Sequence, residues 1–155
     1  MIVENAGYQD ADELTCMRLA YLKEDYGTLQ KKDEETIREL LPGYFRKHLN
    51  QDLFGYVVRD NEEIVSCALL LVTQKPMSPA FINGKTGTVL NVYTKPEHRH
   101  KGYAKAVMEY LMSEASKMNL SVVELKATDA GYPLYKAIGF EDDRSGYHLM
   151  KWKNN

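Results

Sequence analysis

The chain has 155 residues and a formal net charge of −2 at pH 7, with 44% hydrophobic and 27% charged residues. This length suits one domain with a continuous core, and the composition excludes a disordered, collagen-like or disulfide-dense chain. The small negative charge gives no general attraction to nucleic acid or to an anionic membrane, so an anion site would need a local cause. We therefore predict a single domain over residues 1–155, with no nucleic acid and no membrane as partner.

The two cysteines, Cys16 and Cys67, lie in segments of regular pattern and lack the spacing of a metal or redox motif. We predict both as reduced core residues, and because neither has a histidine beside it, we expect no covalent catalysis. The first residues lack the basic and apolar regions of a secretory signal. No run approaches the roughly 18 apolar residues of a membrane span, so the sequence predicts a cytoplasmic protein.

The first quarter of the chain predicts a short strand and two helices. Residues 2–6 form the strand, and Asp10 and Glu13 then have the spacing of a capping box at the start of a helix. A second helix is predicted after Asp33, because apolar residues recur there at helical spacing. Pro42 lies inside that pattern, next to a glycine, and predicts a break into two unequal pieces.

The middle of the chain predicts three strands. Residues 53–59 and 63–73 have a period of two, with Val65, Cys67, Leu69 and Leu71 on one face, which indicates a hairpin with its turn at residues 60–61. Residues 74–86 contain two prolines and an Asn-Gly pair and predict a long loop. A further strand is expected over residues 88–94, where a proline soon follows.

The last third predicts a strand-helix-strand unit and a short helix. Apolar residues recur at spacings of three and four over residues 104–118, which predicts an amphipathic helix. Residues 121–127 predict the next strand, and the pair at 128–129 is placed to cap a short helix that ends at Gly139 in a left-handed conformation. Beyond that glycine we expect the last strands, including one over residues 147–152. This order is typical of a mixed α/β fold.

The start of the long helix has an unusual composition. Helix starts favour Ser, Thr, Asp or Asn, but residues 98–105 contain none of these. The segment instead places Arg99, Lys101 and Lys105 where the helix dipole is already positive. Gly102 lets a bulky group approach the main chain, and the strand-loop-helix order directs successive amides to one point. The pattern suits a pyrophosphate, although a hydrated basic helix start fits these features equally well.

Two segments of the second half match a known pattern. Residues 99–104 read Arg-His-Lys-Gly-Tyr-Ala, and residues 134–140 read Leu-Tyr-Lys-Ala-Ile-Gly-Phe. Together they resemble the R/Q-x-x-G-x-G/A and L-Y-x-x-x-G-F signatures of the GNAT superfamily of N-acetyltransferases. The sequence lacks both the phosphate loop of NTPases and the Gly-x-Gly-x-x-Gly fingerprint of dinucleotide-binding folds.

The resemblance implies a GNAT-like α/β fold (α+β mixed), in which helices flank a central twisted mixed β-sheet and splayed parallel strands form the acyl-CoA cleft. It implies an enzyme that moves an acetyl group from acetyl-CoA to a primary amine of a small molecule or peptide by direct transfer. Coenzyme A is the cofactor so implied, without a metal, and the pair His98 and His100 is a poor zinc signal by itself. A homodimer remains open, because subunit contacts leave no clear pattern in the sequence.

The resemblance also implies roles for individual residues. The main chain of Val92 and Thr94 would pair with the pantetheine arm, and the Val92 N–H is the candidate donor to the oxyanion. Tyr135 matches the tyrosine that donates a proton or a hydrogen bond to the departing thiolate, where charge develops late in the reaction. Other cofactor contacts, mostly around the pyrophosphate, would come from Arg99, His100, Lys101, Gly102, Tyr103, Ala104 and Thr128.

The general base stays unassigned at this level. Thr88 lies near the start of the central strand, where some family members place a glutamate. Asp129 and His148 are candidates, but a helix cap and a half-exposed strand residue explain them as well, and a water relay would serve equally. The missing base gives weight to an alternative, a non-catalytic acyl-CoA-binding or regulatory module. A nucleic-acid-binding protein is a third, weaker alternative.

The acceptor pocket is expected in the first helices and the hairpin, which are rich in tyrosine and acidic residues. The acidic residues would favour a cationic acceptor, but core packing and solvated helix faces explain both groups equally well. The sequence therefore does not identify the acceptor. The residues concerned are Tyr21, Tyr26, Tyr44, Tyr56, Glu24, Asp25, Asp33, Glu34 and Glu35.

Overall fold

The computed structural model describes residues 1–154 and contains one five-stranded sheet with the strands in the order β1-β2-β3-β4-β5. Strands β1 to β4 pair antiparallel with one another, whereas β5 is parallel to β4. This arrangement confirms the predicted mixed sheet. The strands are β1 (Glu4–Asn5), β2 (Leu53–Asp60), β3 (Glu63–Gln74), β4 (Lys85–Thr94) and β5 (Val122–Glu124).

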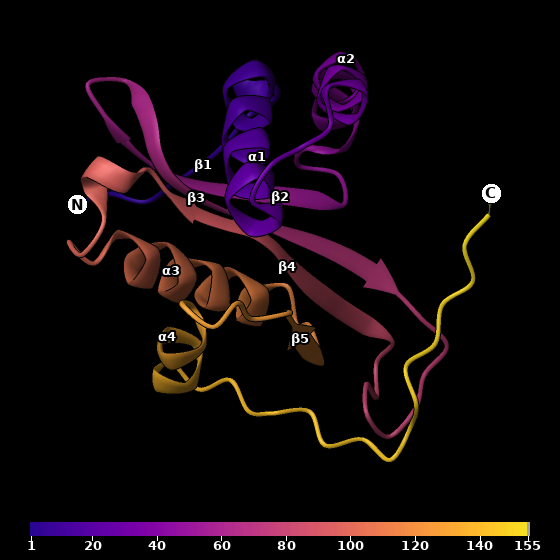
Figure 1. Ribbon diagram of the computed structural model, residues 1–155. Helices are drawn as coiled ribbons and strands as arrows, with labels where there is room; N and C mark the ends of the chain where they lie inside the picture. Colours follow the sequence, from indigo (N-terminus) through magenta and orange to yellow (C-terminus); the bar gives the residue numbers. More distant parts are fainter. Residues whose placement is uncertain (155) are drawn as a thin grey trace.

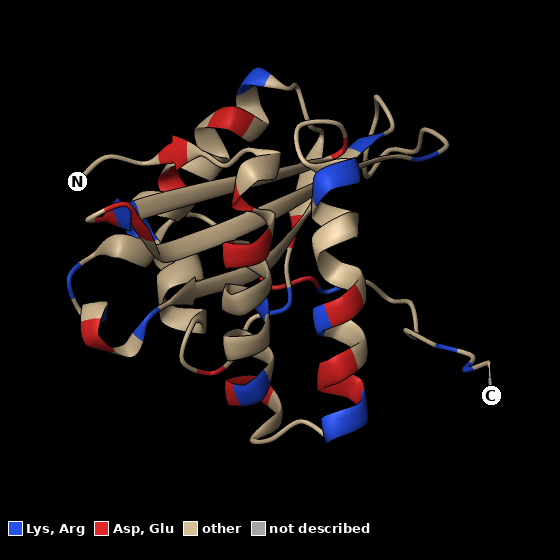
Figure 2. Cartoon of the chain, turned by 90° about the horizontal axis from the view of Figure 1, so that it is seen from above, with Lys and Arg blue, Asp and Glu red and all other residues tan. Residues whose placement is uncertain are grey.

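Helices cover both faces of the sheet (Figure 1), with α1 and α2 on one side and α3 and α4 on the other. The helices are α1 (Ala11–Tyr26), α2 (Lys31–His48), α3 (Tyr103–Lys117) and α4 (Tyr132–Ala137), with short 3-10 turns η1 (Tyr8–Asp10) and η2 (Pro96–His98). Charged residues gather on the helices and loops, while the strands are largely free of charge (Figure 2). Burial of apolar surface on both faces therefore holds the layers together.

Each face of the sheet has its own apolar cluster. Leu14 and Phe45 belong to the cluster under α1 and α2, and Met108 and Leu111 belong to the cluster under α3. Each of these four side chains is at most 1% exposed. Full burial of such a side chain stabilises the fold by about 1.5–3 kcal/mol, so the two clusters fix the helices on the sheet.

The β2–β3 hairpin is confirmed, with its turn one residue later than predicted. Asn61 and Glu62 have positive φ values of 51° and 69° and connect Asp60 to Glu63, which pair across the strands. Two consecutive left-handed residues are typical of the tight turn that matches the twist of a hairpin. The turn consequently uses Asn-Glu rather than Asp-Asn.

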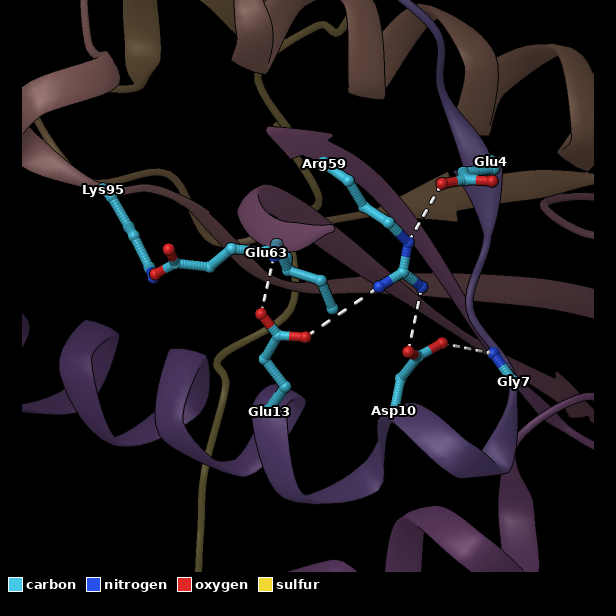
Figure 3. Close-up of polar contacts among 8 residues, drawn as sticks. Glu4, Gly7, Asp10, Glu13, Arg59, Glu63 and Lys95 are labelled. Atoms are coloured by element: carbon cyan, nitrogen blue, oxygen red, sulfur yellow. Dashed lines mark hydrogen bonds and ion pairs between the residues drawn. The ribbon is translucent and has the colours of Figure 1, made fainter. Parts of the chain in front are cut away.

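The predicted capping box at the start of α1 is wrong, because both of its carboxylates bind other partners (Figure 3). Asp10 accepts from the Gly7 N–H at 2.8 Å and from Arg59 at 2.9 Å, and it makes no cap hydrogen bond to α1. Glu13 accepts from the Ile64 N–H at 2.6 Å. Arg59 also contacts Glu4 at 2.9 Å. These bonds attach the start of α1 to β1 and to the hairpin.

The predicted break in the second helix is also wrong. One continuous helix, α2, runs through Pro42, although proline cannot donate the hydrogen bond of its turn. Phe45 is buried beyond the proline, and the Leu49 N–H bonds to its carbonyl oxygen. We attribute the continuity of the helix to this anchored second half, which packs against the core.

The predicted strands after residue 140 are wrong, since residues 141–154 contain no strand. This segment leaves α4 and passes the sheet as an irregular chain (Figure 1), and Tyr147 and Trp152 are 90% and 83% exposed. Asp142 accepts hydrogen bonds from Tyr132 and Lys136 of α4, which hold the chain away from the sheet edge. The edge itself is short, because β5 has three residues rather than the predicted seven.

The two cysteines differ, so the prediction that both lie in the core is half correct. Cys67 is buried in β3, whereas Cys16 is exposed on α1. Burial raises the pKa of the Cys67 thiol to about 12, which leaves it without a thiolate at neutral pH. Among residues 1–154, no helix is long and apolar enough to cross a membrane.

Candidate active site

The site lies where β4 and β5 separate. The two strands pair in parallel only from Thr86 to Thr88 of β4, so the rest of β4 has no neighbouring strand on that side within residues 1–154. On the other side, Cys67 pairs with Tyr93 and Leu69 with Leu90, which leaves one extra residue in β4. This bulge bends the strand and frees main-chain groups next to the gap.

Asn91 occupies the bulge in a left-handed conformation, with φ of 54°. Its side chain is 4% exposed, its Nδ2 lies 3.7 Å from Cys67 Sγ, and its Oδ1 has no hydrogen-bond partner. Few residues with a side chain adopt this left-handed conformation, and burial at the bulge holds Asn91 in it. The conformation of Asn91 in turn fixes the direction of the next peptide. The next residue is Val92, which the sequence assigned to the site.

Two clefts meet at this point. The helix-start cleft, of about 710 Å³, lies between α1, the end of β4 and the start of α3. The strand cleft, of about 620 Å³, lies between α1 and the separating ends of β4 and β5. Each volume is that of a small-molecule site. The residues that line both clefts form the junction, namely Tyr21, Asp25, Val92, Thr128 and Tyr135.

The start of α3 faces the helix-start cleft with unbonded amides. Within residues 1–154, no main-chain N–H of residues 100–105 donates a hydrogen bond, and the N-cap Gly102 supplies no side-chain cap. His100 and Gly102 have φ values of 62° and 84°. Left-handed residues just before a helix turn successive N–H groups toward one point and so form a concave anion site. The helix dipole strengthens anion binding there. This geometry matches the predicted pyrophosphate site.

Arg99 is held by the protein beside these amides. Its Nη2 donates to Glu24 of α1 at 2.7 Å, and its Nε donates to the Thr94 carbonyl oxygen at 2.8 Å. Its guanidinium lies 5.4 Å from the centre of the Tyr93 ring. The hydrogen bond from Arg99 lowers the pKa of Glu24, so this carboxylate is charged at neutral pH. Arg99 thus lines the cleft as a positioned cation that already has one carboxylate partner.

Tyr135 lies at the junction and is 9% exposed. Burial, with a smaller effect of Tyr21, raises the pKa of Tyr135 to about 12, so its hydroxyl keeps its proton at neutral pH. A Cβ on Gly131 would lie 2.8 Å from the Tyr135 ring. Glycine at that position therefore lets the ring pack against the preceding turn. The result is a fixed phenol donor between the two clefts.

The structure brings together all of the predicted site residues except Lys101, which lies outside the lining of both clefts. The short helix starts later than predicted, because Gly131 is its N-cap and Thr128 instead accepts from the Gly131 N–H at 3.1 Å. Neither candidate base, Asp129 or His148, lines a cleft. The residues predicted for the cofactor loop and the phenol thus lie together at the clefts, whereas the two candidate bases do not, and the roles of all of them stay predictions.

The residues that sequence reasoning could not assign come from α1. Tyr21, Glu24 and Asp25 all line the helix-start cleft. Their spacing of three and four residues puts them on one side of a helix, which is a signal that the sequence contains. A polar helix side is usually hydrated surface, however, so only packing of α1 over β4 reveals that this one faces a cleft.

No group of three or more potential ligands could hold a metal ion in the part of the chain that the structure describes. The groups that the site presents are main-chain amides, a positioned arginine and a protonated phenol. A sheet whose parallel strands separate beside such a helix start defines the class of acyl-CoA-dependent N-acyltransferases.

Residues 15–140 match the model of the acetyltransferase (GNAT) family. The chain belongs to this family. This confirms the family resemblance, the fold class and the enzyme class that the sequence predicted. A search of curated proteins gave no significant match.

Solved structures agree with the family. A predicted acetyltransferase from Clostridium acetobutylicum, solved with acetyl-CoA, has 28% identity and a TM-score of 0.83, over 96% of this chain and 95% of that chain. A ribosomal-protein-alanine N-acetyltransferase from Brucella melitensis biovar Abortus 2308 has 21% identity and a TM-score of 0.69, over 97% and 100%. An aminoglycoside acetyltransferase from an uncultured soil metagenomic sample has 17% identity and a TM-score of 0.71, over 97% and 98%. The last two share only the fold with this chain, and the acceptors in their names differ, so the fold leaves the acceptor open.

Proposed function

We propose that this acetyltransferase moves the acetyl group of acetyl-CoA directly to a primary amine of a small molecule or peptide. The observation that carries the proposal is the row of unbonded amides at residues 100–105, in a cleft that meets a second cleft at Tyr135. The first cleft suits the donor and the second suits the acceptor. Both substrates could meet at the junction of these two clefts.

The donor would bind along β4 and α3. The N–H groups of residues 100–105 would receive the pyrophosphate, with the positive end of the helix dipole behind them. Of the predicted contacts, His100, Gly102, Tyr103 and Ala104 line this cleft directly. The free side of β4 at Val92 and Thr94 would pair with the amides of the pantetheine arm, as an added strand pairs with a sheet edge.

The transfer needs three functions at the junction. The amine nitrogen loses a proton and bonds to the acetyl carbon, and the bond from that carbon to sulfur breaks. The Val92 N–H, next to the bulge, would stabilise the carbonyl oxygen as it gains negative charge. The Tyr135 hydroxyl would give its proton to the departing thiolate and recover one from solvent. The proton of the amine would leave through water, since Asp129 and His148 lie outside both clefts.

Release of free thiol from acetyl-CoA, measured with a panel of primary amines, tests this function. We expect release that depends on the amine, together with a molar equivalent of N-acetylated product. A non-catalytic acyl-CoA-binding module would bind CoA in a calorimeter yet show no amine-dependent release. That second result would reject the proposed transfer and favour the rival function.

A further inference from the structure

The strand cleft contains charges that the protein does not neutralise. Two carboxylates at the clefts have partners, since Glu24 contacts Arg99 at 2.7 Å and Glu124 contacts Lys75 at 3.6 Å. Within residues 1–154, in contrast, Arg18, Asp25 and Lys126 have no ion-pair partner within 4.0 Å, although all three line the strand cleft. Charges that face a cleft without a partner are available to a ligand.

These three charges are ordered along the cleft. Asp25 belongs to the junction, whereas Arg18 and Lys126 line only the strand cleft. Arg18 lies seven residues before Asp25 in α1, so the two side chains share a helix face about 10 Å apart along the axis, which is too far for them to pair. Lys126 follows β5 and therefore comes from the other wall. The cleft is negative at the junction and positive beyond it.

Tyr21 lies on the cleft-facing side of α1, between Arg18 and Asp25. It lines both clefts and is partly buried, as is Leu22 beside it. An apolar body with one polar tip separates the negative end of the cleft from the positive end. A ligand that spans the cleft would thus meet a carboxylate, an aromatic surface and then two cations.

We infer that the acceptor is a primary amine that also carries an anionic group, a carboxylate or a phosphate. Asp25 would receive the ammonium group at the junction, and Arg18 and Lys126 would bind the anion from opposite walls. This inference rests on the proposed function, because it takes the strand cleft as the acceptor side. Arginine and lysine are the side chains best suited to both anions. Asp25 is exposed, so water can take the proton that the ammonium loses before attack.

Calorimetry on the full chain loaded with CoA tests the inference without depending on turnover. Two matched pairs of ligands, long enough to reach from Asp25 past Tyr21 to Arg18, serve as probes: 6-aminohexanoate with its primary amide, and 5-aminopentyl phosphate with 5-aminopentanol. We expect the anionic member of at least one pair to bind about ten-fold more tightly, the advantage typical of charge-assisted hydrogen bonds. The pair with the larger ratio distinguishes a carboxylate acceptor from a phosphate acceptor.

Variants assign the effect to residues. Arg18→Gln and Lys126→Gln should each reduce the preference for the anionic member, and the double variant should abolish it. Asp25→Asn should weaken both members of a pair. Lys23→Gln is the matched control, since Lys23 lies on α1 but contacts Glu34 of α2 at 3.1 Å and lines neither cleft. Lys23→Gln should leave the affinity ratio within each pair of probes unchanged.

Equal affinities within both pairs, no binding of any probe, or a preference that survives the double variant would overturn the inference. Those outcomes leave CoA binding and thiol release intact, so they are distinguishable from failure of the proposed function. A chain that bound the anionic probes but released no thiol with any amine would retain the anion site and reject the transferase.

Discussion

The two ends of α1 carry the same kind of contact but differ in what the contact does. At its start, Asp10 binds Arg59 of β2, and at its end, Glu24 binds Arg99 of the loop before α3. The Asp10 side chain is 7% exposed and the Glu24 side chain is 50% exposed. A carboxylate and an arginine thus form a buried anchor at one end and part of an open cleft at the other.

From this difference we conclude that burial, and not residue type, decides how much such a pair contributes to stability. Breaking a buried pair leaves a charge without water or a partner, which costs several kcal/mol. An exposed pair contributes little to stability, because water replaces each partner. The exposed end of the helix is therefore free to serve a ligand, while the buried end is not.

The largest expected effect is at the buried end. Asp10→Ala removes the most buried carboxylate partner of Arg59 and the acceptor of the Gly7 N–H, and the loss of these two charge-assisted hydrogen bonds should lower the free energy of unfolding by about 3 kcal/mol. Asp12→Ala is the control, since Asp12 pairs with Arg46 at the same helix end but its side chain is 80% exposed. Denaturant titration measures both. Equal losses in the two variants would contradict the role that we give to burial.

The next effect concerns turnover at the junction of the two clefts. Tyr135→Phe should lower turnover about 100-fold, because the departing thiolate loses its proton donor, while CoA affinity should stay within about two-fold. Tyr132→Phe provides the control on the same helix, since its hydroxyl binds Asp142 outside both clefts. Thiol release and calorimetry separate the two quantities. Unchanged turnover in Tyr135→Phe would remove this phenol from the mechanism.

A third change separates backbone strain from ligand contact. Gly102→Val should weaken CoA binding about ten-fold or more, because a side chain would stand before amides that must reach the pyrophosphate. Gly27→Val is the control at the end of α1, since the two glycines have φ values of 80° and 84° and a Cβ would meet no atom within 4 Å at either. Gly102 is in the left-handed helical region, where a side chain costs roughly 1–2 kcal/mol. Gly27, with ψ of −42°, lies outside this region, so the control variant carries at least as much strain. Equal CoA affinity in both would place the pyrophosphate elsewhere.

The smallest effect is at the open end of α1. Glu24→Gln should reduce the free energy of unfolding by at most about 1 kcal/mol at pH 7, because the pair with Arg99 is largely exposed. Since Arg99 lowers the pKa of Glu24, the stabilisation is complete above the ordinary glutamate pKa and disappears as pH falls through the lower value of the folded state. The difference between wild type and variant should therefore vanish in acid. A loss above 2 kcal/mol, or a difference that persisted at pH 2, would contradict this account.

Local patterns predicted most of the fold. Strands β2 to β4, the helix α3 and the left-handed Gly139, with φ of 110°, all follow from periodicity or turn chemistry. One error, the capping box, occurs where distant residues compete for a local group. Asp10 and Glu13 have capping-box spacing, yet Arg59 and the Ile64 N–H take their oxygens instead. A sequence window cannot show such competition, because the partners lie about 50 residues away.

By itself, the sequence determined the family, and it predicted the cofactor loop and the phenol at Tyr135, because these depend on residue types at fixed short spacings. Only the tertiary structure decided which side chains of α1 face the clefts, where β4 and β5 separate, and that residues 141–154 leave the sheet. The physical reason is that a short motif fixes main-chain geometry within one loop or helix. The lining of a cleft, in contrast, depends on how separate elements pack, and every buried contact in the core contributes to that packing.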